Sequence, residues 1–316
     1  MNTVAVDLGS NTFRVVQMEC TSLEPVAWYE KIVRTADGLH ESGKISEAAV
    51  ERILEAAKEA KGVIDLSLPT FAVTTEALRK ASNAEEVLER IKKESGLNFR
   101  IISGAEEADF TLLAVKKRLE KLGVESESFV MADIGGGSTE ILFYEAGRVC
   151  SGSFGVGIVT VAQKYGSLEK IEEALPAVMG DIYEFVRKTR AEGYSPRTFV
   201  STAGTPTTVA AMKLGMTYES YSAKEVNGTI LKREDLKRQF ERLLALDEES
   251  RRKLVGVGRE DLIAAGILIL ERLFEAVGFE ETTVIDDGLR EGLAIAGCLG
   301  MLKNWEDSFT VIQNQR

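Results

Sequence analysis

Histidine is nearly absent from this sequence, with His40 as the only one in 316 residues. That scarcity argues against a histidine-rich metal hydrolase, and a Ser-His-Asp arrangement would depend on His40 alone. The three cysteines, Cys20, Cys150 and Cys298, are widely spaced. They predict neither a disulfide framework nor a zinc site, and their odd number is typical of a reduced compartment, so we expect a cytoplasmic protein.

Long apolar runs and an excess of basic residues are also missing. No segment approaches the roughly 20 apolar residues of a membrane span, and the N-terminus lacks the features of a signal peptide. The net charge is −11, which argues against nucleic acid or a membrane surface as a partner. A polyanionic substrate stays compatible with this charge, because screening over about 8 Å lets a local basic groove decide capture.

What the sequence does contain is a glycine-rich turn between two apolar segments, with an acid on each side. The turn reads Asp133-Ile134-Gly135-Gly136-Gly137-Ser138-Thr139-Glu140. Glycines allow backbone N–H groups to converge on an anion, hydroxyls add short donors, and the two acids can hold a hard cation such as Mg²⁺. The alternative is a hairpin whose turn merely requires glycines.

A second stretch near the N-terminus follows the same plan. Asp7 closes an apolar segment and is followed by Gly9, Ser10 and Asn11 before another apolar segment, and Asp7 lies 126 positions (133 − 7) before Asp133. That separation suits a duplicated domain rather than a short repeat. We therefore expect Ser10 and Asn11 to contact phosphate and Asp7 to join Asp133 and Glu140 as a metal ligand.

Other candidates lie where predicted strands meet turns or helices. Arg34 is either an edge-strand guard or an anion contact, and Arg79 opens a helix after a short strand, where open α/β sheets bind anions. Glu106 and Glu107 begin the next predicted helix, a position usually explained by the helix dipole. Gly204 belongs to a small-residue turn over 202–208, which would either bind phosphate or ribose or cap the following helix. A single long helix is expected over 167–192.

Taken together, these motifs resemble the exopolyphosphatase / guanosine pentaphosphate phosphohydrolase family. The resemblance covers about residues 1–300 and rests on seven segments in order: Asp7–Asn11, Val33–Arg34 with Gly38–Leu39, Leu78–Arg79, Ile102–Ala108, Asp133–Glu140, Thr202–Thr205 and Gly288–Gly292. It implies a two-domain duplicated actin-like ATPase (ribonuclease H-like) α/β fold with an interdomain active-site cleft. We expect domains at 1–122 and 123–301. A closing helix is expected at about 302–316, as a segment able to pack back on the first domain.

The resemblance also assigns roles. It implies that Glu107 is the catalytic carboxylate that orients and deprotonates water, that Asn11, Arg79, Gly135 and Ser138 contact phosphate, and that Asp133 and Glu140 serve Mg²⁺ and water placement. The sequence departs from the family pattern at Ile158, where an Arg is usual, and at Asn227-Gly228, where a His-Gly turn is usual. The C-terminal helical domain of long members is absent from this sequence.

The expected reaction is release of terminal phosphate from inorganic polyphosphate, with Mg²⁺ as cofactor. Hydrolysis of guanosine pentaphosphate is the nearest alternative, since the same site would serve both substrates. A kinase or nucleotide-dependent clamp of the actin-like superfamily, with Gly204 near an adenosine, and a non-catalytic polyphosphate or alarmone sensor are further alternatives. Exposed hairpin edges make a homodimer a reasonable expectation.

Overall fold

The computed structural model describes residues 1–256 and 262–302. It divides the chain into two units, Met1–Val115 together with the segment from Asp287 onward (unit 1), and Lys116–Asp286 (unit 2). This division corrects the expected boundaries of 1–122 and 123–301, because the chain returns to unit 1 at Asp287. The closing helix expected at about 302–316 lies outside the described residues, apart from its first position.

The sheet of unit 1 combines an antiparallel meander with two parallel strands. Its order is β3-β2-β1-β4-β5, with β1 antiparallel to β2 and parallel to β4. The strands are β1 (Asn2–Leu8), β2 (Thr12–Glu19), β3 (Glu24–Ile32), β4 (Thr70–Thr74) and β5 (Phe99–Ile101). Because side chains alternate along β1, Val4, Val6 and Leu8 enter one core and Ala5 enters another, on the opposite face.

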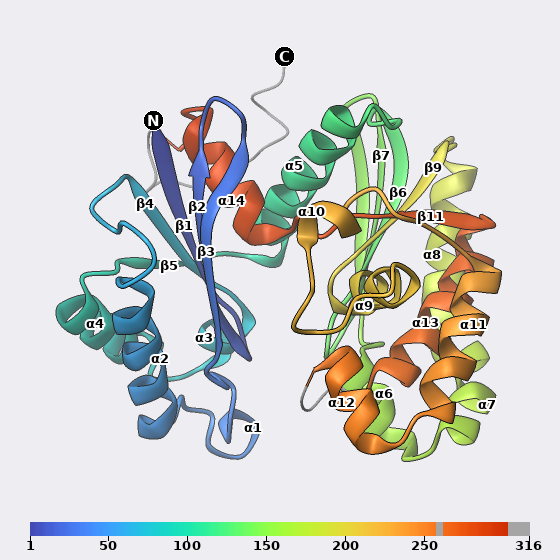
Figure 1. Cartoon of the computed structure of the whole chain (residues 1–316), viewed down its shortest axis with the longest axis horizontal. Coiled ribbons are helices and arrows are strands. Elements are labelled where there is room, and N and C mark those ends of the chain that lie inside the picture. Colours follow the sequence, from blue (N-terminus) through green and yellow to red (C-terminus); the bar gives the residue numbers. More distant parts are fainter. Residues whose placement is uncertain (257–261, 303–316) are drawn as a thin grey trace. The chain divides into compact units, whose positions relative to one another are not determined.

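Helices cover both faces of this sheet. One face carries α1 (Leu39–Ser42), α2 (Glu47–Ala60), α3 (Glu76–Lys80) and α4 (Ala84–Ser95). The other face packs against α14 (Leu289–Cys298), which lies beside β1 and β2 (Figure 1). The apolar run Leu293–Ala296 is buried there with Val16 and Met18, which explains why the C-terminal segment belongs to unit 1. Helix α5 (Gly104–Leu122) crosses the unit boundary.

Unit 2 repeats the strand plan of unit 1, which confirms the predicted duplication. Its sheet has the order β10-β11-β9-β6-β7-β8, so β8-β7-β6-β9-β11 corresponds to β3-β2-β1-β4-β5. The strands are β6 (Ser128–Ile134), β7 (Thr139–Glu145), β8 (Arg148–Phe154), β9 (Thr198–Thr202), β10 (Ile230–Lys232) and β11 (Glu281–Val284). Asp7 on β1 and Asp133 on β6 therefore occupy equivalent strands.

The helices of unit 2 correct two expectations. They are α6 (Ile158–Tyr165), α7 (Leu168–Val178), α8 (Gly180–Ala191), α9 (Gly204–Lys213), α10 (Ala223–Val226), α11 (Arg233–Ala245), α12 (Glu248–Val255) and α13 (Leu262–Val277). The helix expected over 167–192 is divided at Met179 into α7 and α8, and Pro176, which lacks the N–H that a helix interior needs, lies in the last turn of α7. Residues 204–208, expected in a turn, form the start of α9.

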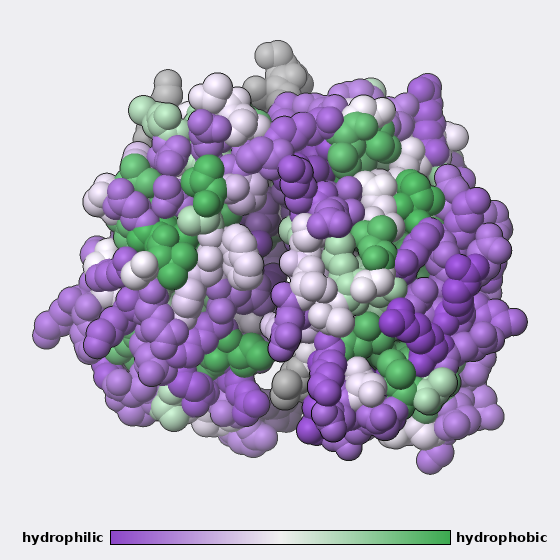
Figure 2. All heavy atoms as spheres, in the orientation of Figure 1, coloured by the Kyte–Doolittle hydropathy of each residue, from purple (hydrophilic) through white to green (hydrophobic). Residues whose placement is uncertain are grey.

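The surface in view is mostly hydrophilic, with apolar side chains in small groups (Figure 2). Among the described helices, none combines the length and apolar character needed to cross a membrane. The edge strand β3 exposes Val26, Trp28 and Ile32 at 55%, 65% and 53%. Unpaired strand edges of this kind can pair with another chain, and the homodimer stays a prediction.

A disulfide between Cys20 and Cys298 corrects the expectation of three unpaired cysteines. The two residues are separated by 278 positions, and their Cα atoms lie 4.9 Å apart. Cys20 follows β2 and Cys298 ends α14, so the packing of α14 on β1 and β2 brings them together. Sequence spacing gave no signal of this approach, because it depends on the return of the chain to unit 1. Cys150 is unpaired.

Candidate functional site

The first glycine-bearing turn, Gly9–Asn11, connects β1 to β2. Its carbonyl oxygens accept hydrogen bonds from the segment that follows β3. Asn11 O accepts from the N–H of both Val33 and Arg34 at 2.9 Å, and Ser10 O accepts from Ala36 N at 2.9 Å. Within the described part of the chain, the N–H groups of Ser10 and Asn11 donate to no other residue. Two such N–H groups on one turn are suited to an anion.

Asp7 lies at the end of β1, directly before this turn, and its side chain is buried. Its Oδ1 atom has no hydrogen-bond partner among the described residues. Burial raises the pKa of Asp7 to about 6, although Arg14 and Arg290 act in the opposite direction. A buried carboxylate oxygen without a partner fits a cation ligand, because an ion would supply the interaction that the protein leaves out.

Asp7→Asn is expected to stabilise the ligand-free protein at pH 8, because the ionised carboxylate is costly where it is buried. The pKa of Asp7 rises from 3.8 to about 6 on folding, so the wild type loses stability as pH rises through that window. Two pKa units correspond to up to about 3 kcal/mol above pH 6 and to no difference below pH 4. Denaturant unfolding of both proteins at pH 4 and pH 8 measures this, with surface Asp181→Asn as control. Equal stability of wild type and Asp7→Asn at pH 8 would contradict it.

Charges of alternating sign surround Asp7, and the sequence did not single them out as a group. Arg14 is the register partner of Asp7 on β2, and its Nε lies 3.3 Å from Glu30 on β3. Arg290 at the start of α14 lies 4.0 Å from Glu30 and 2.6 Å from Glu291. In the sequence, only the Gly288–Gly292 motif indicated a residue of this group. The positions of Arg14 and Glu30 beside Asp7 follow from the register of the sheet, which the sequence alone does not give.

The two adjacent glutamates at the start of α5 have different environments. Glu106 accepts from the N–H and hydroxyl of Ser103 at 2.8 and 2.9 Å, and it also pairs with Arg100. Glu106 therefore caps α5. Glu107 lies 3.7 Å from Nη1 of Arg79, whose guanidinium also donates to Ile102 O at 2.5 Å. The structure thus brings together Arg79 and Glu107, two residues predicted separately, within unit 1.

The second turn, Gly135–Ser138, is supported in the same way as the first. The first N–H groups of α6 donate to its carbonyls, from Ile158 to Gly135 O at 3.1 Å and from Val159 to Gly136 O at 2.8 Å. Among the described residues, nothing accepts from the N–H groups of Gly136 and Gly137. A Cβ on Gly157 would lie 2.3 Å from Gly136 O, so only glycine allows this approach. Both turns therefore use their carbonyls for support and keep N–H groups available.

Asp133 and Glu140 face each other across β6 and β7 as register partners. Glu140 Oε1 accepts from the hydroxyls of Ser138 and Ser153 at 2.6 and 2.8 Å, which fixes the carboxylate. In the ranges 1–256 and 262–302, no three acidic, histidine or cysteine side chains form a metal-binding group. A site with one or two carboxylates fits Mg²⁺, which keeps several waters and takes the remaining oxygens from phosphate.

Gly204 stands at the first position of α9, after Ala203 with φ of 69°. A positive φ is unusual for alanine and indicates a constrained turn. The hydroxyls of Thr207 and Thr208 donate back to Ala203 O and Gly204 O at 2.9 and 2.6 Å, and both threonines are buried. These hydroxyls support the helix start, so Gly204 alone stays a candidate contact.

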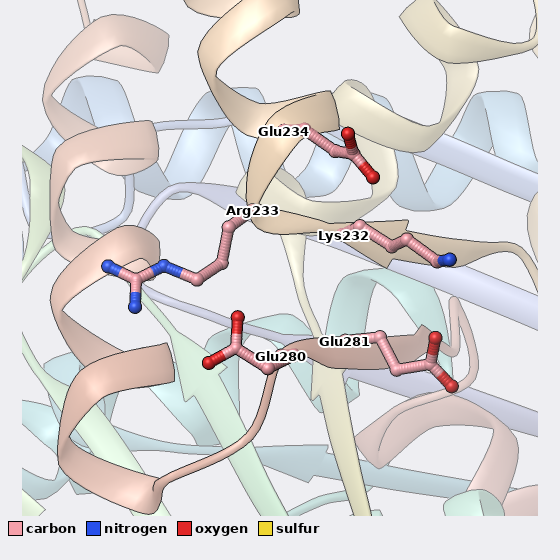
Figure 3. Close-up of a pocket in the computed structure, with 5 residues that line it drawn as sticks. All are labelled: Lys232, Arg233, Glu234, Glu280 and Glu281. Atoms are coloured by element: carbon pink, nitrogen blue, oxygen red, sulfur yellow. The ribbon is translucent and has the colours of Figure 1, made fainter.

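A shallow pocket elsewhere on unit 2 contains none of the candidate residues. It is lined by Lys232, Arg233, Glu234, Glu280 and Glu281 at the edge of the sheet (Figure 3). Arg233 is paired with Glu275 at 3.0 Å. The pocket has charges of both signs and no glycine turn, so it does not share the chemistry of the two turns.

Comparison with known proteins identifies the family to which this chain is similar. A model of the Ppx/GppA phosphatase family matches residues 14–299. Exopolyphosphatase 2 of Mycobacterium tuberculosis is 26% identical over 92% of this chain and 97% of its own length. A guanosine-5'-triphosphate,3'-diphosphate pyrophosphatase of Aeromonas hydrophila is 29% identical over 94% of this chain, but the match spans only 59% of that protein.

Solved structures show the same fold. The Aquifex aeolicus PPX-GPPA enzyme is 30% identical with a TM-score of 0.78, over 94% of this chain and 99% of that one. An exopolyphosphatase from Cytophaga hutchinsonii is 22% identical with a TM-score of 0.79, over 95% of this chain and 98% of that one. The expected actin-like α/β fold is confirmed by these similarities and by the two related sheets.

Proposed function

The chain belongs to the Ppx/GppA phosphatase family, and from this premise we propose that it hydrolyses the terminal phosphate of inorganic polyphosphate. The observation that carries the proposal is the pair of duplicated turns, each preceded by an acid and each with N–H groups free to bind phosphate oxygens. Enzymes of this class are phosphoric anhydride hydrolases. The match over 97% of Exopolyphosphatase 2 supports polyphosphate as the substrate.

Binding of the phosphate chain depends on groups that neutralise its charge. We assign this role to the N–H groups and side chains of the two turns, with Arg34, Arg79 and Gly204. The full set of proposed contacts is Ser10, Asn11, Arg34, Arg79, Gly135, Gly136, Gly137, Ser138, Thr139 and Gly204. Phosphoryl transfer passes through a loose transition state, so positioning and charge neutralisation supply most of the catalysis.

Glu107 is the proposed base. Its carboxylate lies 3.7 Å from Arg79, so a group that binds phosphate is adjacent to one that can accept a proton from water. Glu107 takes that proton as the water oxygen attacks the terminal phosphorus, and the bond to the bridging oxygen breaks. The products are inorganic phosphate and a chain shorter by one phosphate. General-base assistance of this kind contributes about 10²–10⁴-fold.

Mg²⁺ is the proposed cofactor, with Asp133 and Glu140 as donors in unit 2 and Asp7 as the donor in unit 1. The ion would neutralise phosphate oxygens when bound. The unpartnered Oδ1 of Asp7 and the fixed carboxylate of Glu140 support this assignment.

Hydrolysis of guanosine pentaphosphate is the second candidate, supported by the similarity to the Aeromonas hydrophila pyrophosphatase. Phosphate release should be measured with long polyphosphate, short polyphosphate, guanosine pentaphosphate and ATP, each with and without Mg²⁺. We expect the highest kcat/KM with polyphosphate and little release without Mg²⁺. A higher kcat/KM with guanosine pentaphosphate would favour the second candidate. Transfer of the ATP phosphate to an acceptor other than water would support a kinase instead.

A further inference from the structure

Arg52 on α2 contacts the segment that supports the first turn. Its Nε donates to Val33 O at 2.7 Å and its Nη2 donates to Arg34 O at 3.2 Å. The same guanidinium lies 3.5 Å from the Asp37 carboxylate. The planar fork of arginine holds two consecutive carbonyls with two nitrogens at a fixed spacing, whereas lysine offers a single nitrogen on a flexible stem.

The segment that Arg52 holds has an unusual backbone. Arg34 has a φ of 48°, a left-handed conformation that costs a non-glycine residue roughly 1–2 kcal/mol. Val33 and Thr35 on either side are fully buried, whereas Arg34 is exposed. The kink therefore turns the Arg34 side chain outward between two anchored neighbours, and Arg52 binds the carbonyls at the kink itself.

The same segment also forms hydrogen bonds with the first turn, Gly9–Asn11, which we call the phosphate turn. The N–H groups of Val33 and Arg34 both donate to Asn11 O, and that of Ala36 donates to Ser10 O, all at 2.9 Å. Arg52 therefore donates hydrogen bonds to the carbonyls of Val33 and Arg34, and the N–H groups of these same two residues donate to the turn. Loss of this contact would release the kink and shift both Arg34 and the turn.

We infer that Arg52 is a positioning residue for phosphate binding, one that never touches the substrate and acts through Arg34 and the Ser10–Asn11 turn. The inference rests on the proposed function. Arg52 carries no motif in the sequence, because its role depends on two backbone carbonyls that lie 18 and 19 positions away.

The test compares the steady-state kinetics of Arg52→Met and Arg52→Lys with those of the wild type on polyphosphate. We expect KM to rise about 10-fold in both variants and kcat to change less than about twofold, because a displaced turn weakens substrate and transition-state binding equally. Lysine is not expected to rescue, because it lacks the fork. An unchanged KM in Arg52→Met would overturn the inference.

Arg90 provides a matched control. The side chains of Arg90 and Arg52 are both 32% exposed, and Arg90 also contacts α2, through Glu47 and Glu51. Among the described residues its ion-pair partners are Glu47, Glu51 and Glu94, none of which belongs to the kinked segment, so Arg90→Met should leave KM unchanged. An equal rise in KM for Arg90→Met and Arg52→Met would show a general effect of α2 and overturn the inference.

A double-mutant cycle with Arg34→Ala separates positioning from general destabilisation. If Arg52 acts through Arg34 and the turn, Arg52→Met should raise KM far less in the Arg34→Ala background than in the wild type. If Arg52→Met raises KM by the same factor in both backgrounds, Arg52 does not act through Arg34, and the inference is overturned. Binding of polyphosphate to Glu107→Gln, with and without Arg52→Met, gives the same comparison without turnover. Wild-type protein that binds polyphosphate but releases no phosphate would refute the proposed function alone, whereas equal binding by the two Glu107→Gln proteins would refute the inference.

Discussion

Glu107→Gln is expected to lower kcat for phosphate release by about 10²–10⁴-fold, while the folded protein still binds polyphosphate. Glutamine keeps the shape of the side chain but cannot accept a proton from water. Glu107 is partly exposed, at 37% of its side chain, and its neighbour Arg79 retains the hydrogen bond to Ile102 O. The substitution should therefore change chemistry more than structure.

Glu106→Gln is the matched control, because it alters the adjacent residue of the same helix turn. Glu106 caps α5 through Ser103 and pairs with Arg100, so its replacement should lower the thermal midpoint and leave kcat within a few fold. The measurements are phosphate release at saturating polyphosphate, equilibrium binding and thermal unfolding. Near-normal turnover in Glu107→Gln would remove Glu107 from its assigned role.

The duplicated architecture was predictable because both turns are local in sequence. In each, an acid at the end of an apolar strand, glycine and small polar residues lie within a few positions, and β1 and β6 occupy equivalent places in their sheets. Such patterns need no knowledge of distant contacts. The family that they resemble is confirmed, whereas the individual site residues stay predictions.

Features that depend on distant contacts were not predictable. From their position alone, Glu106 and Glu107 had the same explanation, and only the family resemblance selected Glu107; their different contacts, with Arg100 and with Arg79, needed the structure. Arg52 carries no motif, because its partners are backbone carbonyls. The domain boundary was wrong because α14 is adjacent in sequence to β11 of unit 2 but buries its apolar face on β1 and β2. Local periodicity gives the amphipathic face of a helix and not its partner.

The disulfide follows from that same return of α14, and its removal is expected to have the largest effect on stability. It closes a loop of 278 positions, and in the chain-entropy model a loop of this size contributes about 5–6 kcal/mol through the unfolded state. Turnover should be preserved, because Cys20 follows the end of β2 that is opposite the Gly9–Asn11 turn. Eight residues of strand span roughly 25 Å.

Denaturant unfolding with and without a reductant, on the wild type and on Cys298→Ser, measures this effect. The reduced wild type and the variant should unfold at the same lower denaturant concentration, and the reductant should not shift Cys298→Ser further. Cys150→Ser is the control, because Cys150 is unpaired and its loss should leave the response to reductant intact. A transition that reductant leaves unmoved in the wild type would mean that the tie between β2 and α14 adds nothing to their packing. Loss of turnover on reduction, with stability unchanged, would instead mean that the disulfide positions the Gly9–Asn11 turn.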